Sequence, residues 1–295
     1  MIKKFCPICG KEAASELVYE ENLPKDIKEM DFSGRKNPDG YHYQMTRCKT
    51  CSLLYASEIY EEEFSNKLYN ESSFDYIEEL NGLKKTYRKC LIEASKNIIE
   101  KKNFLEIGCG NGFMLNEALD IGFKKVIGIE PSKNAIELAP LNIKDKIIHG
   151  VFDKSKFENN SFDIVFISMI IEHVVDINFF LLSIYEILKP GGRVVCICHN
   201  ESHFLARMLK NKHPIINDEH VTIFSKNTLL KIFKKNLFKE IQIQELKNYY
   251  SAKYWIKMLP SPNILKKIFS FIFLSILKNI TLGLKAGNLY LIAKK

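Results

Sequence analysis

The sequence predicts an α/β protein whose core is a doubly wound, mostly parallel sheet, preceded by a small cysteine-rich module. Short apolar runs alternate with helix-forming segments between residues 104 and 200, and the first run leads into a glycine-rich turn. Two Cys-x-x-Cys pairs near the N-terminus predict the module. With 295 residues, 46% hydrophobic and 26% charged, the chain is long enough for one large domain and an accessory module.

The N-terminal module contains both Cys-x-x-Cys pairs, separated by a long stretch. A structural zinc ion suits this pattern, because each pair can aim two sulfurs at one tetrahedral centre. The alternatives are a redox motif and thiols placed by chance, and a redox motif usually occurs once and on a βαβ unit. We therefore expect residues 1–58 to form a zinc ribbon whose metal stabilises the fold and keeps no open position for catalysis. The predicted ligands are Cys6, Cys9, Cys48 and Cys51.

The main domain is expected to span residues 102–295, after a helical linker over residues 59–101 in which apolar residues recur at helical spacing. Pro190 is expected to end a helix, and Gly191 and Gly192 to turn the chain into the fifth strand. The predicted elements between the glycine-rich turn and residue 200 are helices 113–121, 132–139 and 176–188 and strands 125–130, 146–149, 162–168 and 192–198.

The C-terminal third departs from this alternation. Helices are predicted over 202–212 and 226–235, with Ser225 as the cap of the second. Residues 287–295 resemble a final antiparallel strand, so the chain would end inside the main sheet. The intervening residues 249–284 are expected to form a helical insertion.

The glycine-rich turn reads Leu-Glu-Ile-Gly-Cys-Gly-Asn-Gly over residues 105–112. Glycines allow positive φ and a close approach of the backbone to a ligand, and the helix that follows would point its N-terminal amides at that ligand. Glu130 ends the next predicted strand, where its carboxylate can accept hydrogen bonds from ribose hydroxyls. A dinucleotide-binding turn would need its third glycine where Phe113 stands. The pattern therefore predicts a nucleoside site.

Four motifs occur in a fixed order over about a hundred residues: the glycine-rich turn, Gly-Ile-Glu-Pro-Ser from Gly128, Ser-Phe-Asp-Ile-Val-Phe from Ser161, and Leu-Lys-Pro-Gly-Gly-Arg-Val-Val from Leu188. Together they resemble the class I S-adenosylmethionine (SAM)-dependent methyltransferases, which have a Rossmann-like sheet. The resemblance implies SAM as cofactor. The residues that it implies for binding SAM are Glu106, Gly108, Gly110, Gly112, Glu130, Pro131, Val151, Phe152 and Ser168. Many members carry an aspartate in place of Val151, and Asp153 is expected to substitute for it.

The catalytic site of such an enzyme lies beyond the fourth strand, where Glu172 and His173 follow. Methyl transfer requires alignment of the nucleophile and, for a protonated nucleophile, a base. The Glu172–His173 pair resembles that position in small-molecule and sugar methyltransferases, so either residue is a candidate base. His220, in a Glu-His-x-x-x-Phe segment similar to one in these enzymes, is a second candidate, and His199 a weaker one. Met169 stands where quinone-type members often carry a glutamate, which argues against a metal-assisted O-methylation of quinones.

The expected acceptor is a small molecule. Zinc ribbons joined to this kind of methyltransferase resemble enzymes that act on nucleotide-linked sugars or cell-surface polysaccharide precursors. An RNA methyltransferase is one alternative, although no Asn-Pro-Pro-Tyr-like turn follows the fourth strand. The other alternative is a non-catalytic SAM-binding or zinc-mediated interaction module.

The net charge of +8 is spread over scattered lysines, so it gives no strong nucleic-acid signal. The sequence shows neither a secretory apolar stretch nor an apolar run of the roughly 18 residues that a spanning helix needs. This predicts a cytoplasmic protein. Residues 264–284 are apolar between lysines and could contact a membrane surface peripherally; a buried lid or a dimer helix is the alternative. The sequence predicts no oligomeric state.

Overall fold

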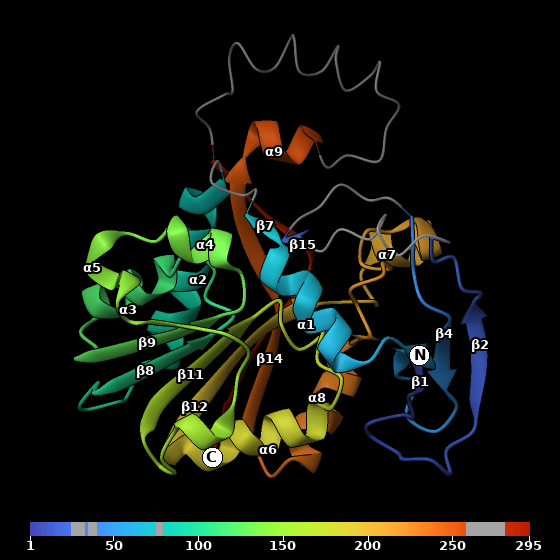
Figure 1. The fold of residues 1–295 in the computed structure, drawn as a ribbon, viewed down its shortest axis with the longest axis horizontal. Coiled ribbons are helices and arrows are strands. Elements are labelled where there is room, and N and C mark those ends of the chain that lie inside the picture. Colours follow the sequence, from blue (N-terminus) through green and yellow to red (C-terminus); the bar gives the residue numbers. More distant parts are fainter. Residues whose placement is uncertain (25–32, 35–39, 75–78, 258–280) are drawn as a thin grey trace.

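The protein is described by a computed structural model that covers residues 1–24, 33–34, 40–74, 79–257 and 281–295. Its centre is a seven-stranded sheet with strand order β10-β9-β8-β11-β12-β15-β14 (Figure 1). Neighbouring strands from β10 to β12 are parallel, whereas β15 runs antiparallel to both β12 and β14. The predicted fold class is therefore confirmed. The strands are β8 Asn103–Ile107, β9 Lys125–Glu130, β10 Ile147–His149, β11 Phe162–Ser168, β12 Leu188–His199, β14 Lys239–Ser251 and β15 Thr281–Lys294.

Helices cover both faces of this sheet. Successive side chains of a strand point to opposite faces, and β8 shows the consequence. Leu105 and Ile107 are buried in one apolar cluster together with residues of α6 and α8, whereas Phe104 is buried in another with residues of α2 and α3. The helices are α2 Leu80–Ala94, α3 Phe113–Ile121, α4 Lys133–Glu137, α5 Leu141–Lys144, α6 Ile177–Ile187, α7 Phe204–Leu209 and α8 Lys226–Lys235, with 3-10 turns η3 Lys154–Lys156 and η4 Lys210–Lys212.

Several elements have the bounds that their local sequence predicts. These are α3, β9, β11 and α8. The predicted cap of α8 is also confirmed, because the Thr228 N–H donates to the Ser225 hydroxyl at 3.2 Å. The fifth strand differs: β12 begins earlier than predicted, at Leu188. Its register against β11 shifts beyond Phe162, so the predicted turn residues form an irregularity within the strand.

The predicted helical insertion over residues 249–284 is wrong at both of its ends. β14 continues to Ser251 and β15 starts at Thr281, and these two residues pair across the strands. Within the described part of the insertion only α9, Ala252–Lys257, is helical. Residues 258–280 lie outside the described residues, and with them most of the segment predicted to contact a membrane.

The predicted linker contains two helices, α1 Glu62–Glu71 and α2. Gly82 lets α2 approach β14 closely, because a Cβ there would lie 2.0 Å from the carbonyl oxygen of Tyr249. The Tyr249 N–H donates to the Thr86 hydroxyl of α2 at 3.0 Å. Among the residues that the structure describes, no helix is long and apolar enough to cross a bilayer.

The N-terminal module shares a sheet with the main domain. Its strands β2 Ser15–Tyr19, β4 Met45–Cys48 and β5 Leu54–Ala56 are joined by β13, Thr222–Ile223, in the order β13-β5-β4-β2. β13 lies between α7 and α8 in the chain, so backbone hydrogen bonds connect the two parts. Two short pairs complete the described strands: β1 Ile2–Lys3 with β6 Glu58–Ile59, and β3 Ser33–Gly34 with β7 Ser73–Phe74.

Candidate active site

The glycine-rich turn lies at the carboxyl edge of the parallel strands. The N–H groups of Gly108 and Cys109 both donate to the Ile129 carbonyl, at 2.8 and 3.0 Å. Gly108 has a φ of +71°, and a Cβ there would lie 2.2 Å from Cδ1 of Ile170. The backbone conformation therefore favours glycine, and a larger residue would also have to displace the Ile170 side chain. The same contact places the segment that follows β11 directly against the turn.

Glu130 ends β9 and is held beside this turn. Its Oε2 accepts from the Gly110 N–H at 2.7 Å, and its Oε1 accepts from the Ser132 N–H at 2.8 Å. Burial raises the pKa of the Glu130 carboxyl, and these two backbone N–H groups oppose the rise. Each carboxylate oxygen can accept a further hydrogen bond. The arrangement therefore fits the predicted recognition of ribose hydroxyls.

Glu106 on β8 provides a second buried carboxyl group near Glu130. It is 1% exposed, and within the described structure its Oε2 has no hydrogen-bond partner. Burial, and then the charge of Glu130, raise the pKa of Glu106 well above its usual range. Two neighbouring carboxyl groups favour a ligand that brings positive charge and donors. SAM carries both a sulfonium and an ammonium group, so these residues fit it.

The third glycine of the turn and two other predicted cofactor residues occupy the same edge. Gly112 has a φ of +70° and begins α3 as its N-cap. The Pro131 carbonyl accepts from Nε2 of His149, at 3.0 Å. Ser168 is the last residue of β11 and pairs with Ile197 of β12. Their predicted role in binding SAM stays a prediction.

The three residues predicted to lie near adenine differ in their exposure and in their contacts. Val151 is 42% exposed. Phe152 packs edge-on against Phe180 of α6, with ring centroids 5.7 Å apart, and so forms part of the aromatic core. Asp153 instead begins η3, where its carboxylate accepts from the Ser155 N–H at 2.9 Å. Asp153 therefore caps η3 through one carboxylate oxygen, and its predicted contact with adenine stays a prediction.

Three histidines meet beyond the carboxyl ends of β11 and β12. The ring centroids of His173 and His220 are 4.7 Å apart, and those of His199 and His220 are 5.1 Å apart. Nδ1 of His220 donates to the Ile215 carbonyl at 2.8 Å. Nδ1 of His199 lies 3.2 Å from the side-chain oxygen of Asn288 on β15. The structure thus brings together both histidines predicted to be catalytic and the third, weaker candidate.

His173 is a buried, neutral imidazole whose Nδ1 lies 3.2 Å from the Glu219 carbonyl. Burial, followed by the neighbouring His220 and His199, lowers the pKa of His173 well below its usual range. The hydroxyl of Tyr69 lies 2.7 Å from its Nδ1. Burial raises the pKa of Tyr69 well above its usual range, so the phenol stays protonated. A neutral imidazole always has one nitrogen that can accept a proton.

Tyr69 is the residue of this cluster that the sequence did not indicate. It lies on α1, 104 positions before His173 in the chain. α1 crosses in front of the sheet in Figure 1. The Ser72 carbonyl just beyond its end accepts from the Ser132 hydroxyl, at 2.9 Å, next to Glu130. Helical spacing could reveal α1, but no motif marks its tyrosine as part of the site.

Glu172 is fully buried next to His173. Its Oε1 accepts from the His199 N–H, and its Oε2 has no hydrogen-bond partner within the described structure. Burial raises the pKa of the Glu172 carboxyl to about 7, with a partial offset from the His199 N–H. A carboxyl group in this setting orders the backbone of β12 and is poorly placed to bind an acceptor. Its predicted role as the base stays a prediction.

We expect Glu172→Gln to stabilise the protein above pH 7. Between about pH 4 and pH 7 the folded carboxyl keeps a proton that the unfolded chain has lost, so the free energy of unfolding falls as the pH rises. At pH 8 the buried Glu172 charge therefore lowers the free energy of unfolding by about 3 kcal/mol. Glutamine removes this loss of stability and keeps an oxygen that accepts from the His199 N–H. Urea unfolding at pH 5 and pH 8 measures the effect. An equal pH dependence in both proteins would contradict it.

The four predicted zinc ligands form one cluster. The sulfur atoms of Cys6, Cys9, Cys48 and Cys51 all lie within 4.8 Å of one another. Burial raises the pKa of Cys6 to about 12, whereas hydrogen bonds from backbone N–H groups outweigh burial and lower that of Cys48 to about 7. In the described part of the chain this is the one group of three or more such side chains close enough to hold a metal ion. The donor set fits a tetrahedral thiolate site.

Comparison with solved structures shows the fold alone. A chain from the complex of the Haloferax volcanii Trm112 methyltransferase activator with a methyltransferase superposes with a TM-score of 0.51 at 15% identity, covering 80% of this chain and 99% of that one. The YcgJ protein of Bacillus subtilis superposes with a TM-score of 0.50 at 17% identity, covering 71% and 98%.

Comparison with sequences identifies the family. The demethylmenaquinone methyltransferase of Oceanobacillus iheyensis is 34% identical over 122 residues, which cover 38% of this chain and 50% of the relative. The mitochondrial ubiquinone biosynthesis O-methyltransferase of Schizosaccharomyces pombe is 30% identical over 169 residues, covering 55% and 57%. The chain spans about half the length of these curated relatives. A family model described as a methyltransferase domain matches residues 79–243, more than half of the chain. The chain therefore belongs to this family, the class I SAM-dependent methyltransferases that its motifs resemble.

Proposed function

We propose that the protein methylates a small-molecule acceptor and that His173 takes up the acceptor's proton. The contact between Ile170 and Gly108 carries this proposal, because it sets the segment bearing a buried, neutral His173 directly beside the turn predicted to hold SAM. A non-catalytic SAM-binding protein would have no need of a neutral base in that position.

The proposed division of labour follows from the contacts. Bound SAM supplies a methyl group activated by its sulfonium. Glu106 and Glu130 would hold the ammonium group and the ribose. The acceptor oxygen or nitrogen would form a bond to the methyl carbon as the carbon–sulfur bond breaks, with S-adenosylhomocysteine as the leaving group, while the acceptor's proton moves to His173. Tyr69 would fix the ring through the 2.7 Å contact with Nδ1. His220 would orient the cluster through its bond to the Ile215 carbonyl.

Two classes of acceptor are proposed for testing. A nucleotide-linked sugar or a glycan precursor is the class expected from the sequence, and it offers hydroxyl groups whose proton needs a base. The two relatives described above are named for quinone methylation, so a quinone-type phenol is the second acceptor to test. His173 would serve as the base for either acceptor.

We also propose that the four-cysteine cluster holds a structural zinc ion. Its support is the all-thiolate donor set and the mutual sulfur distances within 4.8 Å. A zinc ion bound by four thiolates has no vacant position, so it would stabilise the module and its junction with β13 without contacting the acceptor.

The proposal predicts that Tyr69→Phe and His173→Asn lower turnover far more than SAM affinity. A panel of nucleotide-linked sugars and quinone-type phenols is screened with labelled SAM to find a methylated product. We expect a loss in kcat of about 10²- to 10⁴-fold for His173→Asn, the usual contribution of a general base. Tyr69→Phe, which removes one contact of the base, is expected to lose less.

The matched control is Tyr185→Phe, because Tyr185 packs on Phe238 by its ring and lies on α6. It should retain wild-type kcat. SAM binding by calorimetry is measured for every variant. Tight SAM binding with no product from any acceptor would favour a non-catalytic role, and unchanged kcat in His173→Asn would remove the proposed base.

A further inference from the structure

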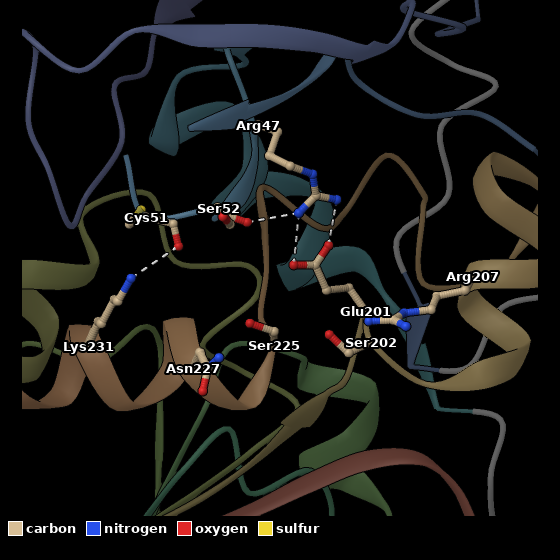
Figure 2. Close-up of a pocket in the computed structure, with 9 residues that line it drawn as sticks. All are labelled: Arg47, Cys51, Ser52, Glu201, Ser202, Arg207, Ser225, Asn227 and Lys231. Atoms are coloured by element: carbon tan, nitrogen blue, oxygen red, sulfur yellow. Dashed lines mark hydrogen bonds and ion pairs between the residues drawn. The ribbon is translucent and has the colours of Figure 1, made fainter. Parts of the chain in front are cut away.

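A basic cavity of about 380 Å³ lies between the N-terminal module and the main domain. Figure 2 shows the residues that line it, which come from three separate parts of the chain: Arg47, Cys51 and Ser52 of the N-terminal module, the segment Glu201–Ser202 after β12, and Arg207, Ser225, Asn227 and Lys231 on or beside α7 and α8. Small-ligand sites have volumes of roughly 300–1,000 Å³. The cavity is therefore large enough for a small group.

The charges in this cavity do not cancel. Arg47 is neutralised by Glu201, because its two guanidinium nitrogens donate to the two carboxylate oxygens at 3.1 and 2.8 Å. Among the residues that the structure describes, Lys231 makes one contact, at 3.5 Å with the Cys51 carbonyl. The Arg207 guanidinium points toward Ser202 and Glu201 in Figure 2, and the described structure gives it no side-chain bond. Two positive charges thus face one cavity, and the described residues that line it supply no further anion to match them.

Polar donors complete the site. Ser225 and Asn227 lie at the N-terminus of α8, a ten-residue helix whose dipole favours negative charge at this end. Ser225 uses its hydroxyl oxygen to cap α8, whereas the Asn227 side chain is exposed at the cavity. Guanidinium, ammonium and helix-terminal groups are the donors that bind phosphate oxygens in proteins.

We infer that this cavity binds a phosphate or diphosphate group of a small molecule. Part of its lining lies close in sequence to the histidine cluster, because Glu201 follows His199 by two residues and Ser225 follows His220 by five. A phosphorylated acceptor could be anchored there while its nucleophile meets the base. That last step rests on the proposed function, whereas binding of the phosphate group does not.

Pyrophosphate binding to the whole 295-residue chain tests the inference without turnover. We expect calorimetry to show binding by wild type and a loss in affinity of about 10- to 100-fold in Arg207→Gln and in Lys231→Gln, as for removal of a charged hydrogen bond. Lys234→Gln is the matched control, since Lys234 is exposed on α8 outside the cavity. It should bind like wild type, and all variants should bind SAM normally.

The outcomes separate this inference from the proposed function. Absence of pyrophosphate binding, or equal affinity in Lys231→Gln and Lys234→Gln, would overturn it even if an unphosphorylated acceptor is methylated. Binding lost only in the cavity variants would support it even if no acceptor is found. Binding of single-stranded RNA that depends on Arg207 and Lys231, without pyrophosphate binding, would assign the cavity to a nucleic-acid backbone and contradict a small-molecule site.

Discussion

Replacing Cys48 with serine is expected to destabilise the whole chain and not the N-terminal module alone. Cys48 ends β4, which pairs with β5, and β5 pairs with β13 of the main domain. Cys6, Cys48 and Cys51 also belong to the same buried cluster as residues of α6 and α8. If zinc links the four thiolates, losing one ligand should cost on the order of 5 kcal/mol, because metal binding free energy becomes folding free energy.

Thermal unfolding together with metal analysis measures this effect. Wild type should contain one zinc per chain and lose stability in a strong chelator, and Cys48→Ser should unfold at a much lower temperature in one transition. Cys90→Ser is the control, because Cys90 is equally buried, lies outside the cluster and can keep its bond to the Thr86 carbonyl as serine. The structural zinc would be refuted if wild type contained no metal and if Cys48→Ser and Cys90→Ser were equally stable.

Local sequence determined much of the fold. The helix after the glycine-rich turn has its predicted bounds because the turn glycine and the following apolar residues set them within one short segment. α8 likewise begins after a serine whose cap is made by its own neighbours. Such elements depend on interactions a few residues apart, which a pattern of residues records.

The sequence did not predict the pairing of strands that lie far apart in the chain. β14 was not predicted, and its partner β15 starts 30 positions after it ends, as the pairing of Ser251 with Thr281 shows. β5 pairs with β13, which places Tyr55 opposite Thr222. Alternation within one strand cannot specify a distant partner, so these contacts required the tertiary structure.

The candidate site also contains some residues that local sequence predicts and others that only the tertiary structure reveals. Glu130 could be predicted because its place at a strand end after the glycine turn is a local property. Tyr69 could not, since nothing in α1 relates it to His173, 104 residues later. Likewise, only the structure shows that Oε2 of Glu106 is buried without a hydrogen-bond partner among the described residues.

Replacing Glu130 with glutamine is expected to abolish measurable SAM binding, with an affinity loss of about a hundredfold or more. The carboxylate accepts from the N–H groups of Gly110 and Ser132 on different oxygens. Glutamine has one carbonyl oxygen, so its NH₂ group must face one of these donors. The turn then loses a bond or shifts, and a ribose hydroxyl loses an acceptor as well.

Calorimetric titration with SAM separates this effect from a general change of charge. Glu137→Gln is the matched control, because Glu137 is exposed on the neighbouring helix α4 and loses the same charge. It should keep wild-type affinity, and circular dichroism should show that both variants are folded. Near-normal SAM binding by Glu130→Gln would mean that neither the two N–H bonds nor a ribose contact at Glu130 matters. The cofactor would then have to be held elsewhere, and the assignment of the glycine-rich turn would fall with it.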